Sequence, residues 1–140
     1  RPRARAAVTR LRRCKVSRIT GNLLNLEQLE RLLSRIHRES EADCWEWQGA
    51  LTPDGYGCIV WRRDGRQVRL QPHRLAWEFF NGRPIPEGLE LDHLCGNRRC
   101  CRPEHLQPTC HAENMRRISW RLVRDYQLRL QHLDAIQGEV

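Results

Sequence analysis

Residues 92–105 read DHLCGNRRCCRPEH, and this stretch carries most of the structural signal in the sequence. Cys95, Cys100 and His105 recur within it at intervals of five residues. Thiolates together with one imidazole are a typical ligand set for zinc, and structural zinc sites take four ligands. Three ligands are therefore local, and the fourth must come from elsewhere in the chain.

The remaining cysteines supply the candidates for the fourth ligand. Cys44 is the strongest, because it stands at the entrance of the first predicted strand, beside two tryptophans. Cys58 is the second candidate, and Cys101 or Cys110 the third. Cys101 adjoins Cys100, and neighbouring residues rarely reach one ion with good geometry. Buried free cysteines are the alternative, but three ligands in so short and arginine-rich a loop favour a metal site.

The composition favours a small basic domain that binds a polyanion. The chain has 140 residues, of which 25 are Lys or Arg and 17 are Asp or Glu, for a formal net charge of +8. Only Lys15 is a lysine, and the guanidinium of arginine pairs with phosphate through two hydrogen bonds. Hydrophobic residues make up 39%. We therefore expect a small apolar core whose stability a bound zinc ion would supplement.

Several classes of protein are excluded by these patterns. No apolar run approaches the roughly 20 residues of a membrane-spanning helix, and we expect no secretory leader. The seven cysteines are an odd number, so a disulfide framework would leave one thiol over. Metal ligation is the better explanation for cysteines beside histidines at short spacing.

The predicted organisation has four parts. Residues 1–24 form an arginine-rich arm, ordered on an anionic surface or else a solvated tail. Residues 25–39 hold a helix with Asn25 as its N-cap. Residues 40–118 form the metal-braced domain, and residues 119–140 form a helical extension.

Local signals predict the elements within these parts. Asp64-Gly65 is a hairpin turn signal, and Pro72 is suited to the first turn of a helix. A β-rich stretch is expected to begin at 44–47. The further predicted strands are 56–61, 67–71 and 89–94, and the predicted helices are 26–38, 73–81 and 110–136. The last helix carries a loose apolar stripe, which favours packing on the core and leaves open whether it pairs two copies or lies along DNA.

Asp92, His93 and Asn114 together suggest hydrolysis of a phosphodiester. That reaction needs a base to take a proton from water, and a hard divalent ion held by oxygen ligands. Imidazole is a base near neutral pH, and carboxylate and amide oxygens suit Mg²⁺. A lone histidine is more often structural, so the combination of the three residues carries the argument.

An ordered succession of motifs, covering about half of the chain, carries a family resemblance. The motifs are CWEWQG at 44–49, YG at 56–57, HR at 73–74, IPEG at 85–88, DHLC at 92–95, NRRC at 97–100, PEHL at 103–106 and EN at 113–114. This succession resembles the HNH, or His-Me finger, endonucleases. It is most similar to the zinc-containing homing-type enzymes of phages and introns, akin to the His-Cys box group.

The resemblance implies an α+β fold, with a small zinc-stabilised ββα-metal core, an antiparallel hairpin, and flanking N-terminal and C-terminal helices. His93 would be the general base. Asn114 would be a ligand of one catalytic Mg²⁺ or Mn²⁺ ion, and Asp92 a second ligand. The structural zinc site would consist of Cys44, Cys95, Cys100 and His105.

Arginines are the expected DNA contacts. The resemblance implies one near the scissile phosphate, for which Arg74 and Arg69 are the candidates; a salt bridge from Arg74 to Glu78 is the structural alternative. The charge pattern makes Arg66 and Arg69 part of a hairpin that would enter the major groove. Further phosphate contacts are expected from the basic arm and from Arg98, Arg99, Arg116 and Arg117.

These patterns predict a Mg²⁺-dependent endonuclease or nicking enzyme acting on double-stranded DNA. The resemblance implies a place in the cytoplasm or nucleoid of a bacterial host, with no membrane partner. The first alternative is a zinc-braced DNA-binding module without significant catalysis, which the presence of both His93 and Asn114 argues against. The second is an RNA-directed or purely structural zinc protein.

Overall fold

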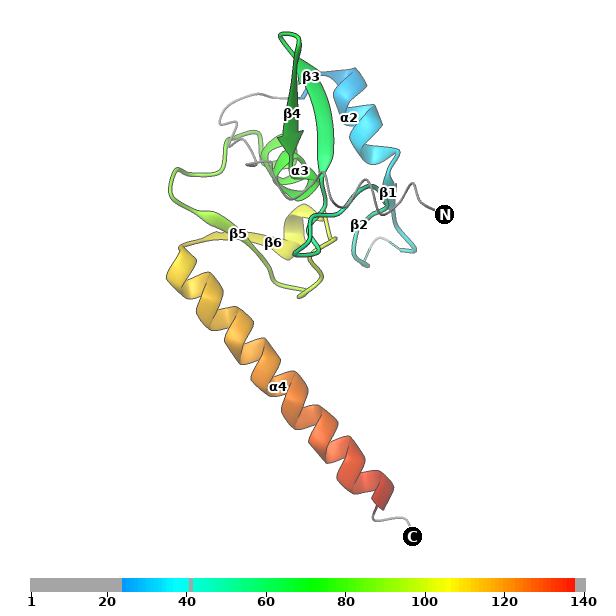
Figure 1. The fold of residues 1–140 in the computed structure, drawn as a ribbon, viewed down its shortest axis with the longest axis vertical. Coiled ribbons are helices and arrows are strands. Elements are labelled where there is room, and N and C mark those ends of the chain that lie inside the picture. The colour runs from blue at the N-terminus through cyan, green and yellow to red at the C-terminus, as the bar shows by residue number, and fades with distance from the viewer. Residues whose placement is uncertain (1–23, 41, 138–140) are drawn as a thin grey trace.

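The computed structural model describes residues 24–40 and 42–137 (Figure 1). The predicted basic arm lies outside the described residues, except for Leu24. In chain order the elements are α2 (Leu26–Leu33), β1 (Ile36–His37), β2 (Glu46–Trp47), β3 (Ile59–Arg63), β4 (Arg66–Leu70), α3 (Pro72–Asn81), β5 (Glu90–His93), the short 3-10 helix η2 (Pro103–His105), β6 (Leu106–Thr109) and α4 (His111–Gln137). This mixture of helices and antiparallel strands confirms the predicted α+β class.

The described strands pair two by two. β1 pairs with β2, β3 with β4 and β5 with β6, each pair antiparallel, and no strand is shared between the pairs. β5, β6 and α4 follow one another as the ββα element that the resemblance implied. The 92–105 stretch therefore begins in β5 and runs to the start of β6, and His93 and Leu106 face each other across the pair.

The first helix is shorter than predicted. Asn25 caps it as expected: its side chain accepts a hydrogen bond from the Gln28 backbone at 2.8 Å, and the Gln28 side chain accepts one from the Asn25 backbone at 3.2 Å. The prediction that the helix continues to 38 is wrong, because α2 ends at Leu33 and the chain turns into β1. Pairing of Ile36 with Trp47, a fully buried residue, outweighs the local helical pattern.

The other predicted elements occur with shifted ends. The hairpin is β3–β4, turning at Asp64-Gly65, where both residues have positive φ. The helix predicted at 73–81 begins one residue earlier, at Pro72. The strand predicted at 89–94 is Glu90–His93, and the long helix begins at His111.

The apolar core has two clusters with α3 between them. One cluster packs Trp47 and Trp61 against Ala76 of α3. The other packs Leu91 and Leu106 against Trp77, the next residue of the same helix. α3 therefore fastens the β3–β4 hairpin to the β5–β6 pair that carries the 92–105 stretch.

Backbone hydrogen bonds fasten the 92–105 loop to the β2 region. The Trp47 amide donates to the Arg99 carbonyl at 2.9 Å, and the Cys101 amide donates to the Trp45 carbonyl at 2.8 Å. The guanidinium of Arg99 donates back to the Trp47 carbonyl at 3.0 and 3.2 Å. These contacts bring Cys44, just before β2, to a loop more than fifty residues further along the chain.

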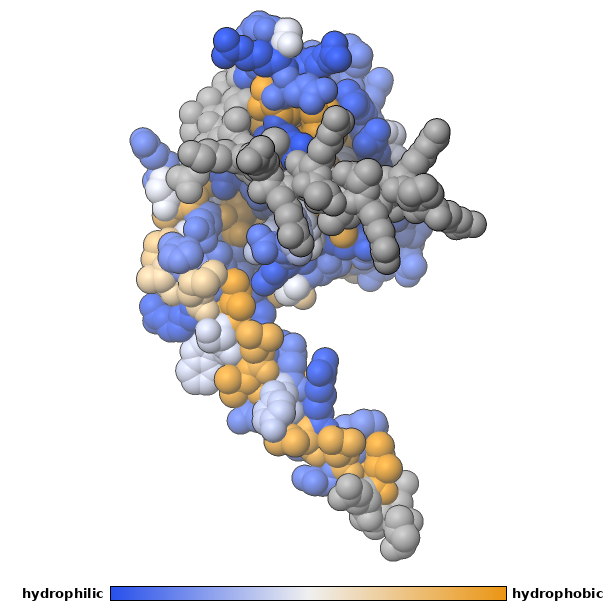
Figure 2. Space-filling view, in the orientation of Figure 1, coloured by the Kyte–Doolittle hydropathy of each residue, from blue (hydrophilic) through white to orange (hydrophobic). Residues whose placement is uncertain are grey.

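α4 extends away from the rest of the described chain beyond its first turns (Figure 1). Its apolar stripe is not buried: Leu122 is 66% exposed and Tyr126 63%, and apolar side chains follow one another along the helix in Figure 2. Packing of this stripe on the core, which the sequence favoured, is therefore wrong for the described residues. No described helix combines the length and the apolar composition that crossing a bilayer requires.

Candidate functional site

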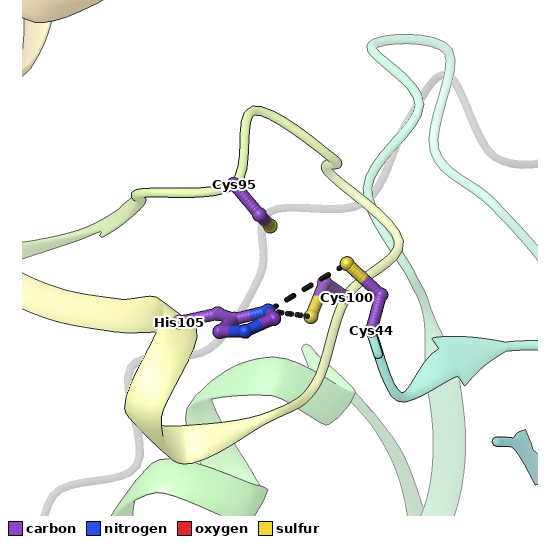
Figure 3. A group of neighbouring side chains, drawn as sticks. All are labelled: Cys44, Cys95, Cys100 and His105. Atoms are coloured by element: carbon purple, nitrogen blue, oxygen red, sulfur yellow. Dashed lines mark hydrogen bonds between the residues drawn. The ribbon is translucent and has the colours of Figure 1, made fainter. Parts of the chain in front are cut away.

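Three side chains spread along the 92–105 stretch converge with Cys44 in a cluster of three cysteines and one histidine (Figure 3). The ligand atoms of Cys44, Cys95, Cys100 and His105 all lie within 4.8 Å of one another. Nδ1 of His105 lies 3.6 Å from the Cys44 sulfur and 3.5 Å from the Cys100 sulfur. Tetrahedral zinc, with ligands at about 2.0–2.3 Å, spaces its ligand atoms by roughly 3.5–3.8 Å. The cluster could therefore hold a metal ion such as zinc.

The structure also decides among the candidates for the fourth member of this cluster. Cys44 joins it, as the sequence favoured. Cys58 is buried and Cys101 belongs to the apolar core beside Trp47. Cys110 is exposed and is not part of the cluster.

The thiols of the cluster influence one another's protonation. A hydrogen bond with Cys100 lowers the pKa of the Cys95 thiol to about 5. The same contact and burial raise the pKa of Cys100, and burial raises the pKa of Cys44. One negative charge is thus already favoured in the cluster at neutral pH. A cation would favour the loss of the remaining thiol protons, since metals bind cysteine as thiolate.

His93 ends β5 with a ring that is only 5% exposed. The ring interacts with the Cys100 backbone through a hydrogen bond, and Nε2 is buried without a hydrogen-bond partner among the described residues. Burial lowers the pKa of His93 below its usual value, so the imidazole is neutral at pH 7. A neutral imidazole that donates from one nitrogen carries a lone pair on the other. The ring of His93 is therefore able to accept a proton.

Two more rings surround His93. The His73 ring, from the first turn of α3, lies 4.8 Å from it between centroids, and the Tyr56 ring lies 5.7 Å away. His73 is 4% exposed, and burial, together with the nearby His93 and Arg74, holds its pKa well below the usual range. His73 is thus a packing neighbour of His93.

Asp92 is 1% exposed and is held by two arginines from α4. Arg121 donates to both carboxylate oxygens at 2.9 Å, and Arg117 donates to Oδ2 at 3.2 Å. Burial alone would raise the pKa of Asp92, but the hydrogen bonds from Arg121 and Arg117 lower it overall. The carboxylate is therefore ionised at neutral pH.

Asn114 lies in the second turn of α4 and is 7% exposed. Its side-chain nitrogen donates to Glu90 at 2.9 Å, and the other Glu90 oxygen lies 2.9 Å from Nδ1 of His111. The pair with Glu90 orients the amide, whose remaining oxygen is an acceptor. His111 thus contacts Glu90 beside Asn114.

One cleft joins the three predicted catalytic residues. Asp92, His93 and Asn114 all line a cavity of about 260 Å³ between the β5–β6 pair and α4. Arg98 and Arg121 line it too. The cavity therefore combines a neutral buried imidazole, oxygen groups and guanidiniums, which is a chemistry suited to a phosphodiester.

The structure distributes the predicted DNA-contacting arginines over different surroundings. Arg66 and Arg69 lie three residues apart in β4, so they point to opposite faces of the hairpin. Arg98 lies 5.1 Å from the Tyr56 ring centre and lines the cleft. Arg99 and Arg117 make internal contacts. Two of the predicted DNA contacts remain. Arg74 is half-buried on α3, and Arg116 is exposed and paired with Glu113 at 2.9 Å.

Arg121 is the residue of the cleft that sequence reasoning missed. The available signal was its spacing of four residues from Arg117, which places both on one face of a helix. That spacing is equally typical of a DNA-facing helix. Only the contact with the buried Asp92 carboxylate distinguishes this internal pair of arginines from a DNA-facing pair.

Comparison with known proteins agrees with this geometry. Residues 71–116, which include Asp92, His93 and Asn114, match the HNH endonuclease family. The predicted resemblance to HNH endonucleases is thereby confirmed.

The similar curated proteins come from phages, which supports the phage-type context. The chain is 36% identical to Protein 2.8 of Escherichia phage T7 over 89 residues, 64% of this chain and 58% of that protein. It is 51% identical to the uncharacterized gene 5.3 protein of Enterobacteria phage T3 over 45 residues, 32% of this chain and 44% of that protein. The chain thus spans about half the length of the curated relatives it matches. No solved structure matches the chain.

Removal of one cluster ligand should release a bound metal. We expect Cys100→Ser to lower the metal content measured by inductively coupled plasma mass spectrometry, and to lower the melting temperature, because the cluster joins β2 to the loop. Cys110→Ser is the matched control, since this exposed cysteine is outside the cluster. Equal metal content in the two variants would contradict a metal site at the cluster.

The buried His73 should make stability depend on pH. Its pKa is lowered in the folded state, so the unfolded chain binds the extra proton first as pH falls below about 6.5. The free energy of unfolding should therefore decrease between pH 7.5 and pH 5.5, by at most about 1.4 kcal/mol per pH unit for one proton.

Urea unfolding of the metal-saturated protein at several pH values measures this slope. His73→Phe, which keeps a ring in the same place, should reduce the slope. His132→Phe, at an exposed position of α4, controls for the loss of a histidine. An unchanged slope in His73→Phe would show that His73 is not the residue responsible.

Proposed function

We propose that this protein is a divalent-metal-dependent endonuclease that hydrolyses phosphodiester bonds of double-stranded DNA, with His93 as its general base. The observation that carries the proposal is the neutral, buried imidazole of His93 in the wall of a cleft that also holds Asp92, Asn114 and two arginines. The match of residues 71–116 to HNH endonucleases supports nuclease activity on DNA.

His93 performs the proton transfer in this proposal. Its neutral ring accepts a proton from the attacking water, while the interaction with the Cys100 backbone keeps the ring in place. Packing against His73 and Tyr56 further restricts the ring. A base with a lowered pKa is present in its active, unprotonated form at neutral pH.

Asp92 and Asn114 offer the oxygen atoms that a hard divalent ion prefers. A Mg²⁺ or Mn²⁺ ion held by them would supply positive charge to the scissile phosphate and the leaving 3′ oxygen. Glu90 supports this arrangement by orienting the Asn114 amide at 2.9 Å. Arg98 and Arg121, on the same cleft, are the arginines we place nearest the phosphate.

The Cys44–Cys95–Cys100–His105 cluster is the proposed structural zinc site. Three of its members follow His93 in the same loop. Its donor set is that of a closed site with four protein ligands. Zinc there would brace the loop rather than take part in hydrolysis. The catalytic ion and the structural ion therefore have separate ligands in this proposal.

A DNA-binding module without catalysis is the second candidate. The observation that favours it is the engagement of both Asp92 oxygens by Arg117 and Arg121, which leaves them committed to guanidiniums. The neutral imidazole of His93 in the wall of the cleft favours catalysis, because a base must be unprotonated to accept a proton from water.

Cleavage of supercoiled plasmid in the presence of Mg²⁺ distinguishes the nuclease from the DNA-binding module. We expect the protein to nick or cut the plasmid, and His93→Ala to lower the rate by about a hundredfold or more, because general bases contribute on this scale. His37→Ala, at an exposed position of β1, is the matched control. Metal content and circular dichroism must stay unchanged in His93→Ala. Cleavage that survives in this variant would overturn the assignment of the base, and no cleavage beside tight duplex binding would favour the binding module.

The hairpin arginines test the proposed groove contact. Replacing Arg66 and Arg69 together with Gln should change sequence preference more than the salt dependence of binding, because base contacts specify and phosphate contacts set the salt slope. Selection from a randomised duplex library, with affinities at several salt concentrations, measures both. The single variants identify the face of β4 that enters the groove. An unchanged preference in the double variant would exclude the hairpin as a reading element.

A further inference from the structure

The carboxylate that the proposed function needs as an ion ligand already has two cationic partners. Arg121 forms a two-pronged contact with it, Nη1 to Oδ1 and Nη2 to Oδ2, both at 2.9 Å. Arg117 adds a single contact to Oδ2 at 3.2 Å. Paired arginines neutralise a carboxylate that is 1% exposed and would otherwise be costly to bury.

Arg121 and Arg117 oppose the binding of a divalent ion to this carboxylate. Arg121 occupies one acceptor position on each oxygen, and Arg117 occupies a further position on Oδ2. A divalent ion at Asp92 would also repel the nearby guanidinium strongly, because a buried site screens charge poorly. Binding of the ion therefore favours the departure of Arg121 from Asp92.

Arg121 is freer to leave than Arg117. Arg117 is also held by Glu113 at 3.0 Å and by Gln107 at 3.0 Å. The hydrogen bonds of Arg121 among the described residues all go to Asp92. Its side chain is 22% exposed and lines the cleft that contains His93.

We propose that Arg121 is a further residue of the site, which binds Asp92 until the catalytic ion displaces it and then binds a phosphate of the DNA in the cleft. This inference rests on the proposed function, in which Asp92 is an ion ligand. Guanidinium pairs with phosphate through the same two-pronged geometry that it uses with carboxylate. DNA thus provides the partner that the displaced side chain needs.

Cooperative binding follows from this exchange. The ion has to displace Arg121 at a cost, and a bound phosphate offsets that cost by receiving the guanidinium. Divalent ion and DNA should therefore strengthen each other's binding by the same factor, since coupling between two binding sites is reciprocal.

Competition between Mn²⁺ and Arg121 for Asp92 is tested with the protein in the absence of DNA. Electron paramagnetic resonance measures the binding of Mn²⁺ during a titration. Arg121→Gln should bind Mn²⁺ about fivefold more tightly than the unsubstituted protein, or more, the scale typical of coupled sites. Arg124→Gln is the matched control, because it removes the same charge from α4 at a residue paired with Asp125 rather than Asp92. Arg121→Lys keeps the charge without the two-pronged contact and should lie between. Circular dichroism and structural-metal content establish that each variant is folded. Equal or weaker Mn²⁺ binding in both Arg121 variants, compared with Arg124→Gln, would overturn the proposal.

Measurements of DNA binding test whether the displaced Arg121 side chain binds a phosphate. Fluorescence anisotropy with a short duplex, in a His93→Ala background that prevents cleavage, compares affinity with and without Mn²⁺. Mn²⁺ should tighten DNA binding severalfold when Arg121 is present, and Arg121→Gln should abolish most of this gain while Arg124→Gln keeps it. A full gain in Arg121→Gln would exclude phosphate as the new partner and overturn the proposal.

Asp92→Asn separates failure of this inference from failure of the proposed function. If Asp92→Asn binds Mn²⁺ as tightly as the unsubstituted protein while plasmid cleavage still depends on His93, Asp92 is not an ion ligand and this inference alone fails. If the unsubstituted protein cuts no plasmid, the nuclease proposal fails, whatever the Mn²⁺ affinities are.

Discussion

The attachment of Cys44 and β2 to the 92–105 loop is the constraint on which the rest of the structure depends. The described strands form separate pairs with no strand in common, so no continuous sheet holds them together. Two small apolar clusters on either side of α3 provide part of the connection. The backbone bonds between the loop and Trp45 and Trp47, together with the Cys/His cluster, provide the rest. A chain with so lean a core gains from such a cross-link, because it closes a long loop.

The same loop joins structural support to the proposed chemistry. His93 ends the strand from which the loop starts, and its ring interacts with the backbone of Cys100, a member of the cluster. The loop then returns through His105 into β6, and β6 leads to the helix that carries Asn114. A change at the cluster is therefore transmitted to the base over a few residues, while the proposed catalytic ion keeps ligands of its own.

Much of the positive charge in the described chain is used internally. Arg99 fastens the loop to Trp47, and Arg117 and Arg121 neutralise Asp92. The surplus of arginine therefore serves internal pairing as well as the proposed attraction of DNA. A guanidinium can serve the two purposes in turn, because carboxylate and phosphate present it with similar pairs of oxygen atoms. Arg121 is the arginine for which we propose this exchange of carboxylate for phosphate, because its side chain lines the cleft.

Features that depend on short separations along the chain could be predicted from the sequence. The cap of α2, the turn of the hairpin, the three local members of the cluster and the Asp92-His93 step are all encoded within a few residues. The sequence favoured Cys44 as the fourth member of the cluster, and the structure places it there. Tertiary contacts set the end of α2 at Leu33, the exposure of the α4 stripe and the contact of Arg121 with Asp92. Each of these depends on contacts between elements far apart in sequence, and local periodicity records which residues can be buried or paired but not which distant partner they meet.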